Sequence, residues 1–269
     1  MKPLLKTLPA GLTAAALLLG SVALTQAETP EEKGFAIAAK SDRSDRGFGD
    51  STVKLKMVLK NKAGKSSTRE LSIKTLEVQD ENVGDKSMLV FASPRDVSGT
   101  ALLSHAKILD PDDQWLYLPA LKRVKRIAST SKSGPFVGSE FAFEDFTSLE
   151  LNKYSYKYLR TEEYDGMVCD VVERYPRYED SGYKRQISWI DQETSQVRKV
   201  DFYNRRDALL KTLTLKDYKK YEDKYWRSLT LEMVNHQTGK STTLTYEDYE
   251  FGTGLEDGDF VKGKLLRAR

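Results

Sequence analysis

The feature that most constrains the fold of this chain is an alternation of apolar and charged residues with a period of two. Between residues 53 and 60, apolar side chains stand at every odd position, and lysines occupy most of the positions between them. Successive side chains of a β-strand point to opposite faces, so this pattern predicts a strand with one buried face and one face in water. Similar short stretches recur along the rest of the chain, near residues 71–78, 88–92, 114–118, 124–127, 154–158, 167–175, 187–189, 200–202, 213–215, 229–233 and 242–249.

Turn and helix signals agree with a mainly β fold. Asp165-Gly166 and Thr238-Gly239 separate neighbouring strand stretches, as the turns of β-hairpins do. Helix signals are few: Thr29 can cap a helix that starts at Pro30 and runs to about residue 40, and a second short helix is possible near residues 141–146. We therefore expect roughly ten or eleven antiparallel strands in a sandwich or barrel.

The N-terminus has the order of a secretory signal peptide. Lys2 and Lys6 precede a mostly apolar stretch, and small residues follow at positions 23, 25 and 27. This order predicts export, cleavage of residues 1–27, and a single mature domain over residues 28–269. An uncleaved membrane anchor is the alternative, and polar residues within the stretch disfavour it.

Charge and motifs exclude several classes of function. The chain has 43 basic and 40 acidic residues, and its formal charge of +3 falls to +1 once Lys2 and Lys6 are removed, so no nucleic-acid partner is expected. The single cysteine, Cys169, cannot form an internal disulfide. No HExxH, CxxC, GxSxG, P-loop or GxGxxG motif is present, and we expect no metal, no cofactor and no catalytic residue.

The strand alternation provides candidates for the lining of a ligand cavity. In the run from Asp110 to Pro119, two aromatic side chains share one strand face, whereas the acidic residues before them resemble either a calcium-binding cluster or, more simply, a solvated turn. The same alternation applies to two other strands. The candidate lining residues are Val53, Leu55, Met57, Leu59, Met88, Val90, Trp115 and Tyr117, with ordinary core packing as the alternative.

A basic hairpin follows Pro119. It contains Lys122, Arg123, Lys125 and Arg126. We interpret it as a candidate docking surface for an acidic partner or for anionic lipid headgroups. The alternative is a solvated strand edge that its charges protect from aggregation.

A glycine-containing segment from Ser131 to Phe146 carries four phenylalanines. Such a segment could act as an apolar lid over a cavity, with Glu144 and Asp145 at its rim. The alternative is a loop that packs its aromatic side chains onto the core. The candidate lid residues are Phe136, Phe141, Phe143 and Phe146.

Together these segments resemble a known family. The run from Trp115 to Pro119, the basic turn after it, the stretch 141–146 and the closing segment 255–266 resemble the LolA-like outer-membrane lipoprotein-sorting proteins, in particular the longer branch associated with RND or MMPL-type exporters. The resemblance extends from about residue 34 to residue 266. It implies a half-open antiparallel β-barrel with an apolar concave face that short helices or loops cover.

The resemblance also implies a function in the periplasm. A protein of this family would shield lipid or lipoprotein acyl chains between the envelope membranes, touch membrane surfaces transiently and work with an inner-membrane RND or MMPL-type transporter. Two alternatives remain open. One is a transporter adaptor that binds no lipid and uses the basic hairpin together with Tyr154, Tyr156 and Tyr158 as its interface. The other is a hydrolase of envelope lipid or glycan with a carboxylate pair in a cleft.

Overall fold

A computed structural model describes residues 27–80 and 82–268. The predicted signal peptide therefore lies, except for Ala27, outside the described residues. Among those residues, no helix combines the length and the apolar character needed to cross a membrane.

The first described element is helix α1 (Pro30–Asp45). The Thr29 hydroxyl accepts the backbone N–H of Glu32 at 3.2 Å, and the Glu32 carboxylate accepts the backbone N–H of Thr29 at 2.8 Å. This reciprocal capping box confirms the predicted helix start. The helix continues to Asp45, beyond the end expected near residue 40.

Among the described residues after α1, one antiparallel sheet of fourteen strands makes up most of the fold. Six of them follow α1 and carry the chain toward one edge. The strands are β1 (Asp50–Lys60), β2 (Ser66–Leu76), β3 (Val83–Ser93), β4 (Ala101–Lys107), β5 (Asp113–Leu118), β6 (Arg123–Arg126), β7 (Tyr154–Tyr164), β8 (Met167–Pro176), β9 (Tyr183–Asp191), β10 (Val197–Asn204), β11 (Leu209–Tyr221), β12 (Tyr225–Asn235), β13 (Ser241–Tyr246) and β14 (Glu250–Phe251).

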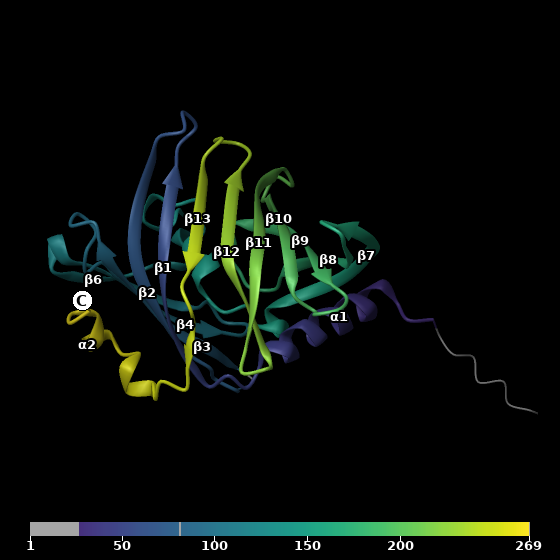
Figure 1. Cartoon of the computed structure of the whole chain (residues 1–269), viewed down its shortest axis with the longest axis horizontal. Coiled ribbons are helices and arrows are strands. Elements are labelled where there is room, and N and C mark those ends of the chain that lie inside the picture. Colours follow the sequence, from purple (N-terminus) through teal and green to yellow (C-terminus); the bar gives the residue numbers. More distant parts are fainter. Residues whose placement is uncertain (1–26, 81, 269) are drawn as a thin grey trace, which may run out of the picture.

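The strand order shows how the sheet stays open. It runs β6-β5-β4-β3-β2-β1-β13-β12-β11-β10-β9-β8-β7, with β14 paired to β1. Strands β6 and β7 are neighbours in the sequence and yet form opposite edges. Segment 127–153, which we call the crossover, therefore carries the chain from one edge to the other, and it packs against the concave side of the curved sheet (Figure 1). The predicted half-open barrel is confirmed.

The fold contains more strands than the ten or eleven expected. The sequence pattern missed β4, whose run of Ala, Leu and Leu does not alternate with polar residues. Leu102 packs into the concave core, while Ala101 and Leu103 pack into a cluster on the opposite face. A strand buried on both faces has no period-two signal. Strand β14 has only two residues, which is too short for any pattern.

Two further segments complete the fold. The crossover contains four single-turn 3-10 helices (Ser129–Ser131, Phe136–Gly138, Phe143–Phe146 and Leu151–Lys153), and the third of these lies at the short helix expected near residues 141–146. The C-terminal segment, with helix α2 (Lys262–Leu265), covers the other face of β3, β4 and β5 through the buried side chains of Phe260 and Leu265.

Helix α1 lies directly on β7, and Gly34 makes that contact possible. A Cβ atom at Gly34 would lie 2.6 Å from the backbone nitrogen of Tyr158 and 2.7 Å from the backbone carbonyl carbon of Lys157. These are backbone atoms of a paired strand, which cannot move aside as the end of a flexible side chain could. The small residue therefore sets how closely the helix approaches the sheet.

We predict that Gly34→Ala destabilises the docking of α1. Helix propensity alone would favour alanine by up to about 1 kcal/mol, but overpacking against a rigid backbone costs about 1–3 kcal/mol. Hydrogen exchange of residues 30–45 should accelerate and the melting temperature should fall. The control is Ala36→Leu at an exposed position of the same helix. Equal protection in both variants would contradict the role of Gly34.

Candidate functional site

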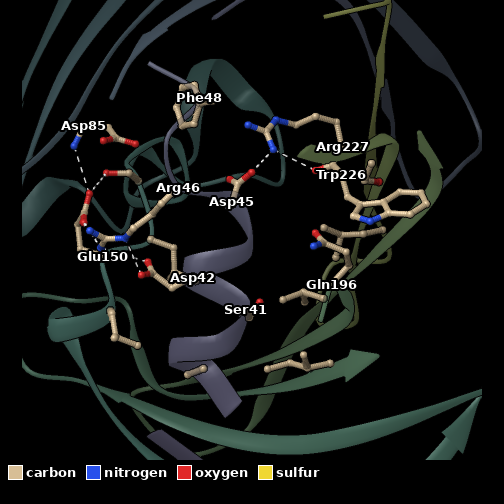
Figure 2. Close-up of a pocket in the computed structure, with 18 of the residues that line it drawn as sticks. Ser41, Asp42, Asp45, Arg46, Phe48, Asp85, Glu150, Gln196, Trp226 and Arg227 are labelled. Carbon is tan, nitrogen blue, oxygen red and sulfur yellow. Dashed lines mark hydrogen bonds and ion pairs between the residues drawn. The ribbon is translucent and has the colours of Figure 1, made fainter. Parts of the chain in front are cut away.

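The candidate site is a cavity of about 470 Å³ between α1 and the concave face of the sheet (Figure 2). Apolar atoms form most of its surface. Its floor is built by strands β7 to β13, whose inward side chains alternate with outward ones. The apolar and aromatic residues of the floor are Tyr156, Val172, Ile190, Val197, Leu215, Tyr218, Trp226, Leu231, Tyr246 and Tyr249.

One wall of the cavity is the C-terminal end of α1, which ion pairs hold on two sides. Asp45 pairs with Arg227 of β12. Arg46 Nε lies 2.7 Å from Asp42 Oδ2, and Arg46 Nη2 lies 4.0 Å from Glu150 of the crossover. Figure 2 shows these pairs on either side of the helix end, facing the open space. Polar contacts, rather than interdigitated core side chains, thus hold this end of α1.

The chain directly after α1 is held by a carboxylate. Glu77 accepts the backbone N–H groups of Gly47 at 2.7 Å and of Gly49 at 2.9 Å. In addition, Lys224 Nζ donates to the carbonyl oxygen of Arg46 at 2.6 Å. These contacts fix the exit of α1 to the residue that follows β2 and to the residue that precedes β12.

A group of carboxylates lies at the edge of the cavity. Asp85 accepts the backbone N–H of Val78 at 2.9 Å, and its own backbone N–H donates to Glu150 Oε1 at 3.2 Å. Burial raises the pKa of Asp85 to about 7, and the nearby negative charges of Glu150, Glu77 and Asp45 act in the same direction. Asp85 is thus a carboxyl group that titrates near neutral pH inside a cavity.

The predicted lining residues of β1 lie on the concave side but not in this cavity. Leu55 and Met57 are part of the main core, and Leu59 packs against it. Val53 is buried on the same strand face. The crossover covers this half of the concave surface, so these side chains form a filled core and none of the four lines the cavity.

The other four predicted lining residues lie on the opposite face of the sheet. Met88 and Trp115 belong to the cluster of Phe260 and Leu265, and Val90 and Tyr117 pack against it. The C-terminal segment covers them there. Strands β3 and β5 carry apolar residues on both faces, so the alternation alone could not distinguish the two sides.

The four candidate lid phenylalanines pack onto the core. The Phe136 ring stacks on Phe91 with centroids 5.7 Å apart, and lies 5.4 Å from Phe143 and 4.6 Å from Phe146. Phe136 and Phe141 are buried. None of the four lines the cavity, and the element that covers it is mainly α1.

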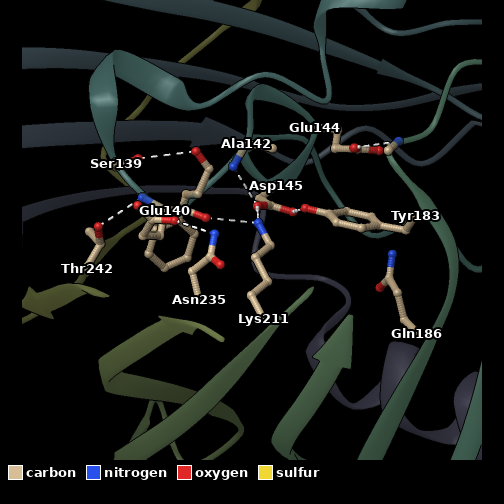
Figure 3. A network of polar contacts seen from close by, with 12 residues as sticks. Ser139, Glu140, Ala142, Glu144, Asp145, Tyr183, Gln186, Lys211, Asn235 and Thr242 are labelled. Atoms are coloured by element: carbon tan, nitrogen blue, oxygen red, sulfur yellow. Dashed lines mark hydrogen bonds and ion pairs between the residues drawn. The ribbon is translucent and has the colours of Figure 1, made fainter. Parts of the chain in front are cut away.

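A polar network holds the crossover in place (Figure 3). Asp145 accepts the Lys211 ammonium at 2.7 Å and the Tyr183 hydroxyl at 2.8 Å. Glu144 accepts the backbone N–H of Gly182 at 2.9 Å and the Ser181 hydroxyl at 2.9 Å, and burial raises its pKa. Neither carboxylate lies at the rim of the cavity; both anchor the crossover to β9 and β11.

The candidate docking residues lie on and beside the edge strand β6. Arg126 pairs with Asp113 of β5. Lys122, Arg123 and Lys125 are exposed, and none of them forms an ion pair within the part of the chain that the structure describes. This edge therefore presents three uncompensated cations next to unpaired backbone groups.

Two residues of the acidic run 110–113 are engaged in ion pairs. Asp112 pairs with the buried Lys153 ammonium at 2.6 Å, and Asp113 pairs with Lys107 at 3.0 Å. Across residues 27–80 and 82–268, no group of three or more His, Cys, Asp or Glu side chains is placed to hold a metal ion.

Helix α1 covers the three tyrosines of β7 that the adaptor alternative would use. Tyr154 and Tyr156 are buried in a cluster with Ala38, and the Lys33 ammonium lies 3.6 Å from the centroid of the Tyr158 ring. The protein's own helix therefore covers the tyrosine part of the surface that the adaptor alternative would use, whereas Lys122, Arg123 and Lys125 of the basic hairpin are exposed.

Comparison with known proteins identifies the family. A family model described as an uncharacterized protein matches residues 84–267. The crystal structure of a domain from Vibrio parahaemolyticus, described as an outer membrane lipoprotein-sorting protein, is 52% identical with a TM-score of 0.85, covering 88% of this chain and 100% of its own. A DUF1329 family protein from Desulfovibrio piger is 27% identical with a TM-score of 0.82, covering 88% and 99%.

A LolA superfamily protein from Nitrosomonas europaea shares the fold, with 20% identity and a TM-score of 0.69 over 85% of this chain and 97% of its own. No curated protein matches the chain. The half-open barrel, the cavity under its covering helix and the 52% identity over the full length of the Vibrio domain agree with one another. This chain therefore belongs to the LolA-like family of outer-membrane lipoprotein-sorting proteins.

Proposed function

We propose that this protein is a periplasmic carrier that shields lipid or acylated lipoprotein cargo from water during transfer between the envelope membranes. The observation that carries the proposal is the mostly apolar cavity of about 470 Å³ beneath α1. Its volume lies within the usual range of ligand pockets, about 300–1,000 Å³. Each methylene removed from water contributes about 0.8 kcal/mol, so a long acyl chain gains substantial free energy there.

The way in which α1 covers the cavity fits a carrier that must also release its cargo. The helix end is held by ion pairs and single hydrogen bonds at the cavity edge, each of which contributes modestly to stability. The helix could then move away from the floor without unfolding the sheet. The Vibrio relative, described as lipoprotein-sorting, supports the same proposal.

We further propose that the carrier docks on an inner-membrane RND or MMPL-type exporter through the β6 edge. Lys122, Arg123 and Lys125 are exposed there, and an edge strand offers backbone groups for pairing with a partner strand. The same cations could contact anionic headgroups transiently.

One observation favours a second candidate function, the hydrolase of envelope lipid or glycan. Asp85, with a pKa of about 7, and Glu150 both line the cavity. A carboxyl group poised near neutral pH is a suitable general acid or base. Purified protein should then release fatty acid or sugar from envelope fractions, and Asp85→Asn should abolish that activity while lipid binding remains. No release under these conditions would eliminate the hydrolase.

We predict that Leu215→Trp empties the cavity of lipid. Leu215 lines the floor beside Leu231, its partner on the neighbouring strand β12. A larger side chain there occupies space that an acyl chain needs. Native mass spectrometry of the protein purified from the periplasm should show at least a tenfold drop in bound lipid. The matched control, Thr214→Trp, places the same bulk on the other face of β11. Equal lipid content in the two variants would refute the cavity as the binding site.

We predict that reversing the charges of the β6 edge weakens docking on the exporter. The triple variant Lys122→Glu, Arg123→Glu and Lys125→Glu should lower recovery of the exporter in a crosslinking pull-down by about tenfold, since rim charges mainly govern the association rate. Lipid content should stay unchanged, because these residues lie outside the cavity. The control reverses Lys54 and Lys56, which are exposed on β1.

We predict that Asp85→Asn raises stability at neutral pH. The folded-state pKa of Asp85 is raised from 3.8 to about 7, so the folded protein binds the proton more tightly than the unfolded chain. This group therefore lowers stability progressively as pH rises from about 4 to 7. The variant and the wild type should melt at similar temperatures near pH 4, and the variant should melt at least about 2 °C higher at pH 7.5. If the difference in melting temperature between variant and wild type is the same at pH 4 and at pH 7.5, the raised pKa of Asp85 is contradicted.

A further inference from the structure

Arg174 is a buried cation on the cavity floor without a carboxylate partner. It lies on β8, is 9% exposed and lines the cavity. Its Nε donates to Gln186 Oε1 at 2.8 Å, a second nitrogen donates to the same oxygen, and its guanidinium carbon lies 5.0 Å from the Tyr154 ring centroid. No ion pair joins it to any acidic side chain of the described residues.

The other charged groups around the cavity already have partners. Arg46 pairs with Asp42, and Arg227 pairs with Asp45. The remaining carboxylates, Glu77, Asp85 and Glu150, each accept hydrogen bonds from backbone N–H groups. Hydrogen-bond donors therefore already satisfy these carboxylates. Of the three arginines that line the cavity in the described structure, Arg174 is the one without an ion pair.

Ser188 is a buried polar group on the same floor that lacks a hydrogen-bond partner among the described residues. It lies on β9, is 3% exposed and lines the cavity, and its hydroxyl has no hydrogen-bond partner in the described structure. The strand register pairs Arg174 with Gln186 and Val172 with Ser188. Ser188 is thus the diagonal neighbour of Arg174 on one sheet face, within reach of a single small group.

These two groups call for the same kind of ligand atom. A buried cation is costly unless it is paired, and a buried hydroxyl without a partner loses its hydrogen bonds to water. An oxyanion satisfies both, because it accepts from a guanidinium and from a hydroxyl together. The neighbouring floor residues, Val172 and Ile190, are apolar and would contact a hydrocarbon chain attached to that oxyanion.

We propose that Arg174 and Ser188 bind the anionic group of a single-chain amphiphile, a carboxylate or a phosphate monoester, whose acyl chain lies along the apolar floor. The inference rests on the proposed carrier function and narrows its cargo to free anionic lipids. A neutral acyl group brings no negative charge to Arg174, and the site therefore discriminates against it.

The test measures binding of four probes to the delipidated protein: palmitate, lysophosphatidic acid, methyl palmitate and monopalmitoylglycerol. Wild-type protein should bind the two anionic probes about tenfold to a hundredfold more tightly than the two neutral ones, as expected for a charged hydrogen-bonded pair. Arg174→Gln should remove that preference, while its affinity for methyl palmitate changes less than about threefold. The difference between palmitate and lysophosphatidic acid reports whether carboxylate or phosphate fits better.

Two further variants separate this role from a structural one. Ser188→Ala should weaken palmitate binding about threefold to tenfold and yet leave the unliganded protein at least as stable, since its hydroxyl makes no bond there. Arg160→Gln, the same change at an exposed position of β7 outside the cavity, should bind all four probes like the wild type.

The outcomes distinguish the inference from the function on which it rests. Equal binding of neutral and anionic probes by the wild type would overturn the anion site and leave the carrier intact. Failure of all four probes to bind would overturn both. An anionic preference that survives in Arg174→Gln would overturn the assignment of these residues.

Discussion

The structure depends on the packing of the crossover, residues 127–153, against the concave face of the sheet. Strands β6 and β7 adjoin in the sequence but form opposite edges, so the connection between them must span the interior of the curl. Phe136 is buried against Phe91, and the Lys211 to Asp145 ion pair anchors the same segment from β11. The edge strands β6 and β7 do not pair with each other, so the sheet stays half-open, and the crossover occupies part of its interior.

The cavity follows from this division of the concave face. Where the crossover lies, aromatic side chains fill the space to the density of a core. Where the crossover does not lie, α1 covers the sheet. Gly34 lets the first half of the helix approach the backbone of β7 closely. The far end of the helix rests on polar contacts with Arg227 and Glu150, so the floor beneath it is covered without being filled. The concave face thus combines a part that the crossover fills and a part beneath α1 that can receive a ligand.

The polar groups of the cavity divide according to whether this chain already supplies their partners. Backbone N–H donors and arginines hold the carboxylates at the edge. Burial, with a smaller contribution from the neighbouring negative charges, raises the pKa of Asp85 to about 7. Arg174, in contrast, donates only to the neutral Gln186 side chain and has no ion pair, and the Ser188 hydroxyl has no hydrogen-bond partner among the described residues. A ligand that binds here does so most favourably by supplying what is missing, which is a negatively charged oxygen attached to apolar mass.

The sequence by itself determined the local features of this fold. Period-two alternation, the Asp165-Gly166 turn and the Thr29 cap are encoded by neighbouring residues, and the structure contains them as expected, with positive φ at both turn residues. Only the tertiary structure decided which face of each strand became concave. Met88 and Trp115 alternate as Leu55 and Met57 do, and yet the two pairs lie on opposite faces of the sheet, because the C-terminal segment covers one and the crossover the other. The cavity residues come from α1, the crossover and at least eight strands, so no local pattern could bring Arg174, Ser188 and Asp85 together.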